Sequence, residues 1–328
     1  MDERKPAYYI DGVRSGNRRI LAKTITLIES AHPNHRQLGR TVVDQLLPET
    51  GKAVRLGITG VPGVGKSTFI ESFGMMLVEK GLQVAVLAVD PSSSRSGGSV
   101  MADKTRMEKL AAAKEAFIRP SPSGGTLGGV ARMTRETMLV CEAAGFDVVM
   151  VETVGVGQSE TTVASMVDFF LVLMLAGAGD ELQGIKKGVL ELADAVAINK
   201  ADGDNLDKAE KARRSYEMAL HLLNPATPTW SPPVMTCSAL TMAGVEALWK
   251  TVQDHRKRMS ATGEIDQKRR RQALAWMWSR IEDGLKERFF NHPKVNARLR
   301  TVEAAVERGE LTPTVGAESL LFLLDNAG

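Results

Sequence analysis

The sequence contains few cysteines and almost no excess of either charge. Cys141 and Cys237 lie far apart beside apolar runs, so we expect free core thiols in a reducing compartment, with a single disulfide between them as the alternative. The 42 basic and 39 acidic residues give a net charge of +3, whereas a dedicated nucleic-acid-binding protein usually has a larger basic excess. A nucleic-acid partner is therefore not expected.

Long hydrophobic runs are missing as well. The longest, residues 169–176, is bounded by Asp168 and Asp180, and it is far shorter than the ~20 apolar residues of a membrane-spanning helix. The charged residues 2–5 are not followed by an apolar stretch of about 7 to 15 residues, so no secretory signal is predicted. We expect a cytoplasmic protein without a membrane partner, in which residues 169–176 form a buried strand.

The chain of 328 residues is long enough for about two domains. Residues 1–52 are predicted to form a helical N-terminal extension of two short helices. Residues 53–261 alternate short β-branched runs with helical stretches, which is typical of an α/β fold with a mainly parallel sheet covered by helices on both faces. Residues 262–328 are predicted to form a helical C-terminal arm. The expected strands are Val54–Thr59, Val84–Val89, Phe117–Arg119, Asp147–Glu152, Phe169–Leu175, Ala195–Asn199 and Val234–Thr236.

Two patterns stand out in the C-terminal arm. The basic run Lys268–Arg271 is interpreted as a solvated helix face, with contact to a partner or a second copy as the alternative. Leu274, Trp278, Ile281 and Leu285 recur at intervals of four, three and four residues and form an apolar stripe on a helix. We expect this stripe to be core or a dimer interface.

A phosphate-binding motif follows the first predicted strand. Residues 60–67 read G-V-P-G-V-G-K-S and match G-x-x-x-x-G-K-[ST] between a strand and a helix, the arrangement of a P-loop NTPase. Its glycines let backbone N–H groups surround the phosphates, and the helix N-terminus adds positive potential. Lys66 should reach the β- and γ-phosphates, and the Ser67 hydroxyl should bind Mg²⁺. The predicted nucleotide-binding residues here are Gly60, Val61, Pro62, Gly63, Val64, Gly65, Lys66, Ser67 and Thr68.

A second motif indicates that the base is guanine. Residues 199–202 read N-K-A-D after a predicted strand. The Asp202 carboxylate can accept hydrogen bonds from N1–H and N2–H₂ of guanine, a donor pair that adenine lacks. Lys200 can lie along the base, and Asn199 can tie the loops together. The next strand is followed by Ser238, Ala239 and Leu240, which resemble the loop whose backbone N–H contacts guanine O6. GTP is therefore expected as the substrate and GDP as the product.

The expected catalytic acids follow two other strands. Glu152-Thr-Val-Gly155 stands where GTPases commonly have Asp-x-x-Gly, and Val156 stands where a glutamine usually orients water. We expect Glu152 to hold Mg²⁺ directly or through water and the Gly155 N–H to sense the γ-phosphate. Because the glutamine is missing, GTP hydrolysis by the protein alone should be slow.

Further candidates lie on stretches of small and polar residues. Asp90 follows a predicted strand, and Asp103 follows a serine- and glycine-rich loop. Either could bind Mg²⁺ or orient the attacking water; the alternatives are a turn-forming residue for Asp90 and a helix-start carboxylate for Asp103. Lys186 could reach the nucleotide or a partner, or be solvated.

Several of these segments together resemble the MeaB-type GTPases, which are chaperones of adenosylcobalamin-dependent methylmalonyl-CoA mutase within the signal-recognition-particle/MinD-related class of P-loop proteins. The resemblance is carried by residues 89–92, 96–99, 103–107, 152–160 and 199–202, of which E-T-V-G-V-G-Q-S-E at 152–160 is the most specific. Ser94-Arg95 departs from it, because a proline-containing stretch is expected there.

The resemblance has several implications for function. It implies a homodimer formed with help from the C-terminal arm, and GTP hydrolysis that is coupled to cobalamin loading and to protection of the mutase. It implies that Asp90, Asp103 and Glu152 are the Mg²⁺-binding and catalytic acids. It also implies a mobile loop over residues 180–187, including Gln183 and Lys186.

Three alternative functions are weighed against this one. A GTPase that inserts another metal cofactor should have a His-rich tract or a Cys-x-Cys-Cys-like motif, and the chain has neither. His32 and His35 flank Pro33, which favours a turn, so no tightly bound metal cluster is expected. An ATP-dependent kinase would also use a P-loop, but the guanine motif disfavours it. A scaffold that binds GTP without turnover is a third possibility.

Overall fold

The computed structural model describes residues 5–89, 107–120, 127–153, 159–177, 187–222 and 228–325. The chain divides into two compact units, Met1–Arg269 and Arg270–Gly328, and each is described by itself.

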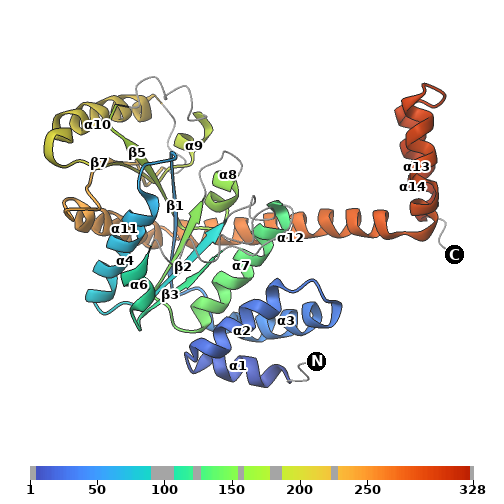
Figure 1. Cartoon of the computed structure of the whole chain (residues 1–328), viewed down its shortest axis with the longest axis horizontal. Helices are drawn as coiled ribbons and strands as arrows, with labels where there is room; N and C mark the ends of the chain where they lie inside the picture. The colour runs from blue at the N-terminus through green and yellow to red at the C-terminus, as the bar shows by residue number, and fades with distance from the viewer. Residues whose placement is uncertain are drawn as a thin grey trace. The chain divides into compact units, whose positions relative to one another are not determined.

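The first unit is built around a seven-stranded parallel sheet (Figure 1). The strand order is β3-β2-β4-β1-β5-β6-β7, and every neighbouring pair is parallel. This arrangement confirms the predicted α/β fold, and each expected strand is present with ends that differ by one residue or none. The strands are β1 (Val54–Gly60), β2 (Val84–Val89), β3 (Ala116–Arg119), β4 (Val148–Thr153), β5 (Phe169–Leu175), β6 (Ala195–Asn199) and β7 (Val234–Thr236).

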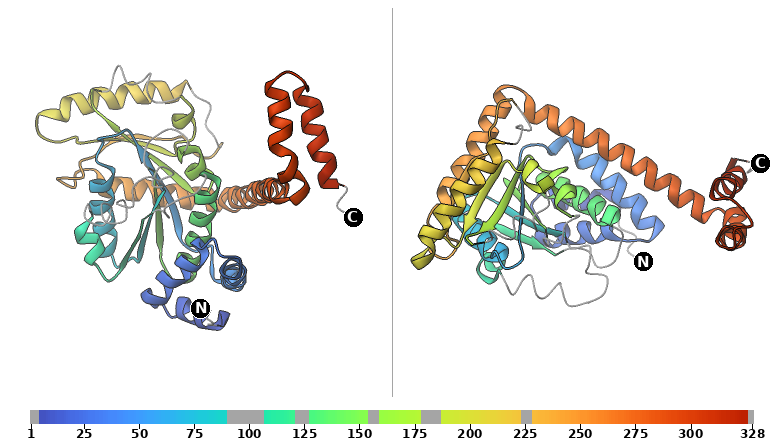
Figure 2. Two further views of the ribbon diagram at one scale, coloured as in Figure 1. Left: turned by 45° about the vertical axis from the view of Figure 1, so that its right-hand side comes forward. Right: turned by 90° about the horizontal axis from the view of Figure 1, so that it is seen from above.

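Helices cover both faces of the sheet, as predicted (Figures 1 and 2). One apolar core joins the sheet to α4 (Lys66–Glu79), α6 (Glu108–Ala112) and α11 (Val245–Ala261). The other joins it to α7 (Leu127–Ala143), α8 (Ser159–Ala164), α9 (Lys187–Glu191) and α10 (Leu206–His221). Strand side chains alternate between the two cores, since successive residues point to opposite faces. Two 3₁₀ turns, Leu47–Glu49 and Gly203–Asn205, complete the connections.

The N-terminal extension contains three helices, where two were predicted. They are α1 (Pro6–Arg14), α2 (Arg18–Glu29) and α3 (Pro33–Leu46), and all three pack against α7. The prediction missed the break between α1 and α2. There Gly16 has a φ of 67°, and the Asn17 side chain caps α2 by accepting hydrogen bonds from the N–H groups of Arg19 and Ile20.

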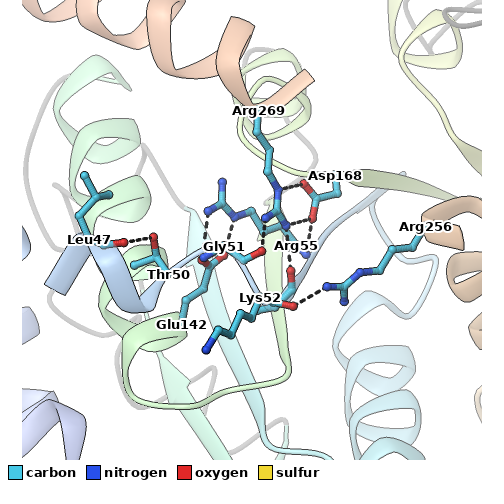
Figure 3. Close-up of polar contacts among 10 residues, drawn as sticks. Leu47, Thr50, Gly51, Lys52, Arg55, Glu142, Asp168, Arg256 and Arg269 are labelled. Carbon is cyan, nitrogen blue, oxygen red and sulfur yellow. Dashed lines mark hydrogen bonds and ion pairs between the residues drawn. The ribbon is translucent and has the colours of Figure 1, made fainter. Parts of the chain in front are cut away.

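The basic run near the start of α12 (Glu264–Asn291) was interpreted as a solvated helix face, but half of it makes contacts within the fold. Arg269 donates from Nη2 to Oδ2 of Asp168 at 2.6 Å and to the carbonyl of Ala53 at 2.9 Å (Figure 3). Lys268 donates from Nζ to the carbonyl of Asp168 at 2.7 Å. These two basic residues therefore fasten the first turns of α12 to the amino end of β5, while Arg270 and Arg271 are exposed.

The second unit is helical. It contains the rest of α12 together with α13 (Pro293–Glu307) and α14 (Pro313–Asp325), which pack against each other. The apolar stripe Leu274, Trp278, Ile281 and Leu285 is exposed on the single chain. Among the described residues of the whole chain, none of the helices has the length and apolar character needed to cross a membrane.

Candidate nucleotide-binding site

The P-loop connects the carboxyl end of β1 to the first turn of α4. Gly63 and Gly65 have φ values of 77° and 87°, a left-handed conformation that costs residues other than glycine free energy. Gly60 lies against β5, where an added Cβ would meet the carbonyl oxygen of Leu173 at 2.5 Å. The glycines of the motif are thus required by the backbone.

Lys66 points back into this loop. Its Nζ donates to the carbonyl of Gly60 at 2.8 Å. Burial lowers the pKa of Lys66, and the negative charges of Glu152 and Glu160 oppose that shift. A bound phosphate would offer the ammonium group charged oxygens in place of one carbonyl, so the side chain is arranged for an anion.

Ser67 and Glu152 meet at the first turn of α4. The Ser67 hydroxyl donates to Oε1 of Glu152 at 3.4 Å, and Glu152 is 9% exposed at the end of β4. Hydroxyl and carboxylate oxygens are the ligands that Mg²⁺ prefers, and two neighbouring ligands of an octahedral Mg²⁺ lie about 3 Å apart. The two residues therefore fit a shared Mg²⁺.

The segment predicted to read guanine, residues 199–202, is tied to the P-loop by two side chains. Asn199 donates from Nδ2 to the carbonyl of Val64 at 2.9 Å, and its Oδ1 accepts from the N–H of Ala239 at 3.2 Å. Lys200 donates from Nζ to the carbonyl of Gly63 at 2.9 Å. Three loops that follow β1, β6 and β7 are thereby held together at the carboxyl edge of the sheet, where parallel sheets bind ligands.

Asp202 belongs to the second of these loops and contacts the third. Its carboxylate accepts a hydrogen bond from the Ser238 hydroxyl, which in turn accepts from the N–H of Thr241 at 3.1 Å. Leu240 is largely exposed at the rim. This arrangement fixes the orientation of the carboxylate that is predicted to read guanine.

Five of the predicted residues lie outside the described residues. These are Asp90, Asp103, Gly155 and Lys186, together with Gln183 of the predicted mobile loop. The roles assigned to them stay predictions.

One residue of the site was not singled out by the sequence analysis. Glu160 ends the 152–160 motif in the first turn of α8, is 4% exposed, and its charge acts on Lys66. The only sequence signal was its place in that motif, because its burial beside Lys66 depends on how α8 packs against β1 and β4.

Both cysteines are buried free thiols, which excludes the alternative of a disulfide between them. Burial raises the pKa of the Cys237 thiol to about 12 and that of Cys141 further. Neither is therefore a reactive thiolate at neutral pH.

The parallel sheet, the P-loop and the N-K-A-D segment beside it define a P-loop GTPase. A family model described as "Methylmalonyl Co-A mutase-associated GTPase MeaB" matches residues 21–294. The chain belongs to this MeaB family, and it is a GTPase.

Curated relatives and a solved structure agree with this membership. A "Putative GTPase" of Caulobacter vibrioides is 56% identical over 320 residues, covering 96% of this chain and 98% of the relative. The "GTPase ArgK" of Escherichia coli is 48% identical, and the match covers 98% of this chain and 97% of that relative. A "Methylmalonic aciduria type A homolog, mitochondrial" of Mus musculus is 45% identical, and the match covers 94% of this chain and 77% of that relative. A crystal structure described as "LAO/AO transport system kinase" is 42% identical, with a TM-score of 0.79 and 99% of each chain covered.

Proposed function

We propose that this GTPase is a chaperone of an adenosylcobalamin-dependent methylmalonyl-CoA mutase, in which GTP hydrolysis gates cofactor loading and protects the mutase from inactivation. The observation that carries the proposal is the match of residues 21–294 to a family described as mutase-associated. The relative named for methylmalonic aciduria type A supports it.

The described part of the site supports the binding steps. Lys66 exchanges the Gly60 carbonyl for oxygens of the β- and γ-phosphates, while Ser67 and Glu152 hold Mg²⁺. When bound, Mg²⁺ neutralises charge that develops on the transferred phosphoryl group. Asp202 accepts hydrogen bonds from guanine, and this selects GTP over ATP.

The remaining steps are assigned to the other predicted residues. Asp90 and Asp103 would bind Mg²⁺ or orient the attacking water. The Gly155 N–H senses the γ-phosphate, and Lys186 adds positive charge from its loop. Because Val156 directly follows Gly155 where GTPases commonly have a glutamine, turnover is slow alone and rises when the mutase binds.

We further propose that the chain forms a homodimer through its C-terminal arm. The exposed stripe of Leu274, Trp278, Ile281 and Leu285 supports this, because contiguous exposed apolar side chains mark interaction surfaces. In this organisation residues 1–52 are the helical extension, 53–261 the GTPase domain and 262–328 the arm.

Steady-state phosphate release tests the proposed function. GTP and ATP are compared, each with the protein alone and with the mutase. The proposal expects slow, GTP-selective release that the mutase accelerates severalfold. GTP-selective release at a rate that does not change when the mutase is added would overturn the chaperone role, while the assignment as a GTPase would still hold.

Two variants control this experiment. Lys66→Ala removes the phosphate-binding ammonium group and should lower turnover about a hundredfold or more. Lys80→Ala removes a surface lysine of the same helix region, which pairs with Glu246 at 2.9 Å, and should leave turnover unchanged. Wild-type turnover in Lys66→Ala would overturn the P-loop assignment, and equal loss in both variants would show that the loss is not specific to the phosphate site.

A second candidate function is an ATP-dependent kinase, because the similar crystal structure is described as a transport system kinase. Preference for ATP in the same assay would favour it. The hydrogen bonds of Asn199 to the P-loop carbonyl of Val64 and of the Ser238 hydroxyl to Asp202 favour guanine instead.

A further inference from the structure

Two buried threonines join β1, which leads into the P-loop, to β4, which carries Glu152. The Thr153 hydroxyl donates to the Thr59 hydroxyl at 2.7 Å. Thr153 is 1% exposed and Thr59 is 2% exposed. Their hydrogen bond crosses from β4 to β1 at the carboxyl edge of the sheet.

The register of the sheet places this bond next to the metal-binding pair. Ile58 of β1 lies opposite Glu152 of β4, so Thr59 and Thr153 are the next residues along each strand. Because side chains alternate between faces, Glu152 faces α4 and Ser67 while Thr153 faces the opposite core. The threonine pair therefore lies behind the Mg²⁺ ligands rather than among them.

Thr153 also lies beside the carboxyl ends of two other strands. It pairs with Val89 at the end of β2, the residue before Asp90. Thr59 precedes Gly60, which ends β1 and begins the P-loop. Any slip of β4 along β1 would move Glu152 relative to Ser67, and would shift β2 with it.

We propose that the Thr59–Thr153 hydrogen bond is a positioning contact that sets the spacing between Ser67 and Glu152 and thereby the affinity for Mg²⁺. The inference rests on the proposed Mg²⁺ site. Its physical basis is that Mg²⁺ demands near-ideal octahedral geometry, so a small displacement between two of its ligands weakens binding. A bond between two hydroxyls in an apolar core resists such a displacement, because neither group has water to replace its partner.

Equilibrium binding of GDP at increasing Mg²⁺ concentrations tests the inference by calorimetry. Thr59→Val and Thr153→Val remove the hydrogen bond with little change in shape. Each should raise the Mg²⁺ concentration needed for half of the metal-dependent gain in GDP affinity about three- to tenfold. GDP affinity in EDTA should stay at the wild-type value. Thr153→Ser keeps the hydroxyl and should keep the wild-type Mg²⁺ requirement.

A matched control separates positioning from stability. Thr24 is 0% exposed on α2, and its hydroxyl donates to the carbonyl of Ile20 at 2.9 Å. Thr24→Val should lower the melting temperature without changing the Mg²⁺ requirement. If the Thr59 and Thr153 variants behave like this control, the inference is overturned.

Two further outcomes keep the result unambiguous. If a single variant folds poorly because one hydroxyl is left without a partner, the double variant Thr59→Val/Thr153→Val should be more stable than that single variant and should still have a raised Mg²⁺ requirement. A wild-type protein whose GDP affinity ignores Mg²⁺ would overturn the proposed metal site itself.

Discussion

At the scale of single residues, the proposed choice of base depends on Asp202. Its carboxylate is oriented by the Ser238 hydroxyl and offers guanine two acceptors. Asp202→Asn removes the charge and one acceptor, so GDP affinity should fall about ten- to a hundredfold while ADP affinity stays the same. Calorimetry with both nucleotides measures the change in discrimination.

The Asp202 experiment has a nearby control. Asp204 is exposed in the 3₁₀ turn Gly203–Asn205, and Asp204→Asn should leave both affinities unchanged. A wild-type ratio of GDP to ADP affinity in Asp202→Asn would show that this carboxylate does not read the base.

A second residue, His255, makes the stability of the fold depend on pH. It is buried on α11, its ring centroid lies 5.0 Å from those of Phe169 and Trp230, and within the part of the chain that the structure describes its Nε2 makes no hydrogen bond. Burial lowers the pKa of His255, and Asp194, 3.6 Å away, opposes that shift. The unfolded chain therefore binds the proton more readily than the folded protein does.

The sign of the pH effect follows from this difference. The contribution of His255 to stability is complete above its ordinary pKa of about 6.5 and is lost as the pH falls toward its lowered folded value. Urea unfolding between pH 8 and about 5 should show the free energy of unfolding falling as the pH decreases. The part of this fall that His255 causes should be missing in His255→Phe. His221→Gln, at the exposed end of α10, should keep it. An unchanged pH profile in His255→Phe would contradict the prediction.

At the scale of elements, the ion pair of Arg269 and Asp168 fastens α12 to the amino end of β5. Burial alone would raise the pKa of Asp168, but the hydrogen bonds and charge of Arg269, with Arg55, outweigh it and hold the pKa below its usual range. Arg269→Met leaves the buried carboxylate without its main partner, so the free energy of unfolding should fall by about 3 to 5 kcal/mol at neutral pH. Arg270→Met, at the exposed next residue, should change it little.

The pH dependence gives this prediction a second measurement. Since the folded pKa of Asp168 is lowered, its contribution is present above the unfolded pKa of about 3.9 and is lost as the pH falls below that value. In Arg269→Met, the free energy of unfolding measured with urea should lack the loss at acid pH that protonation of Asp168 causes. Loss of equal size in the Arg270 variant would argue against a specific ion pair.

The same elements separate what the sequence could predict from what it could not. The strands and the P-loop were predictable because their signals are local: β-branched runs, and glycines at positions that need positive φ. The burial of Lys268 and Arg269 was not, since a basic run on a helix has the same pattern whether it faces water or Asp168, 101 residues away from Arg269. Glu160 was missed for a similar reason, since its place in the 152–160 motif does not show that it is buried and acts on Lys66.

At the scale of the whole molecule, the proposed homodimer makes the exposed stripe of the second unit an interface. Trp278 is 59% exposed at its centre, and aromatic residues in the middle of an interface often carry much of the binding free energy. In a two-fold dimer one substitution changes both sides of the contact. Trp278→Glu should therefore raise the dissociation constant of the dimer about thirtyfold or more.

Sedimentation equilibrium measures this constant. Met218 is a comparably exposed apolar residue on α10 in the other unit, and Met218→Glu should leave the dimer intact. Turnover of GTP by the protein alone should be unchanged in Trp278→Glu, because no residue of the proposed site belongs to the second unit. A monomeric wild type, or a Trp278→Glu variant that dimerises as tightly as the wild type, would exclude the stripe as the interface.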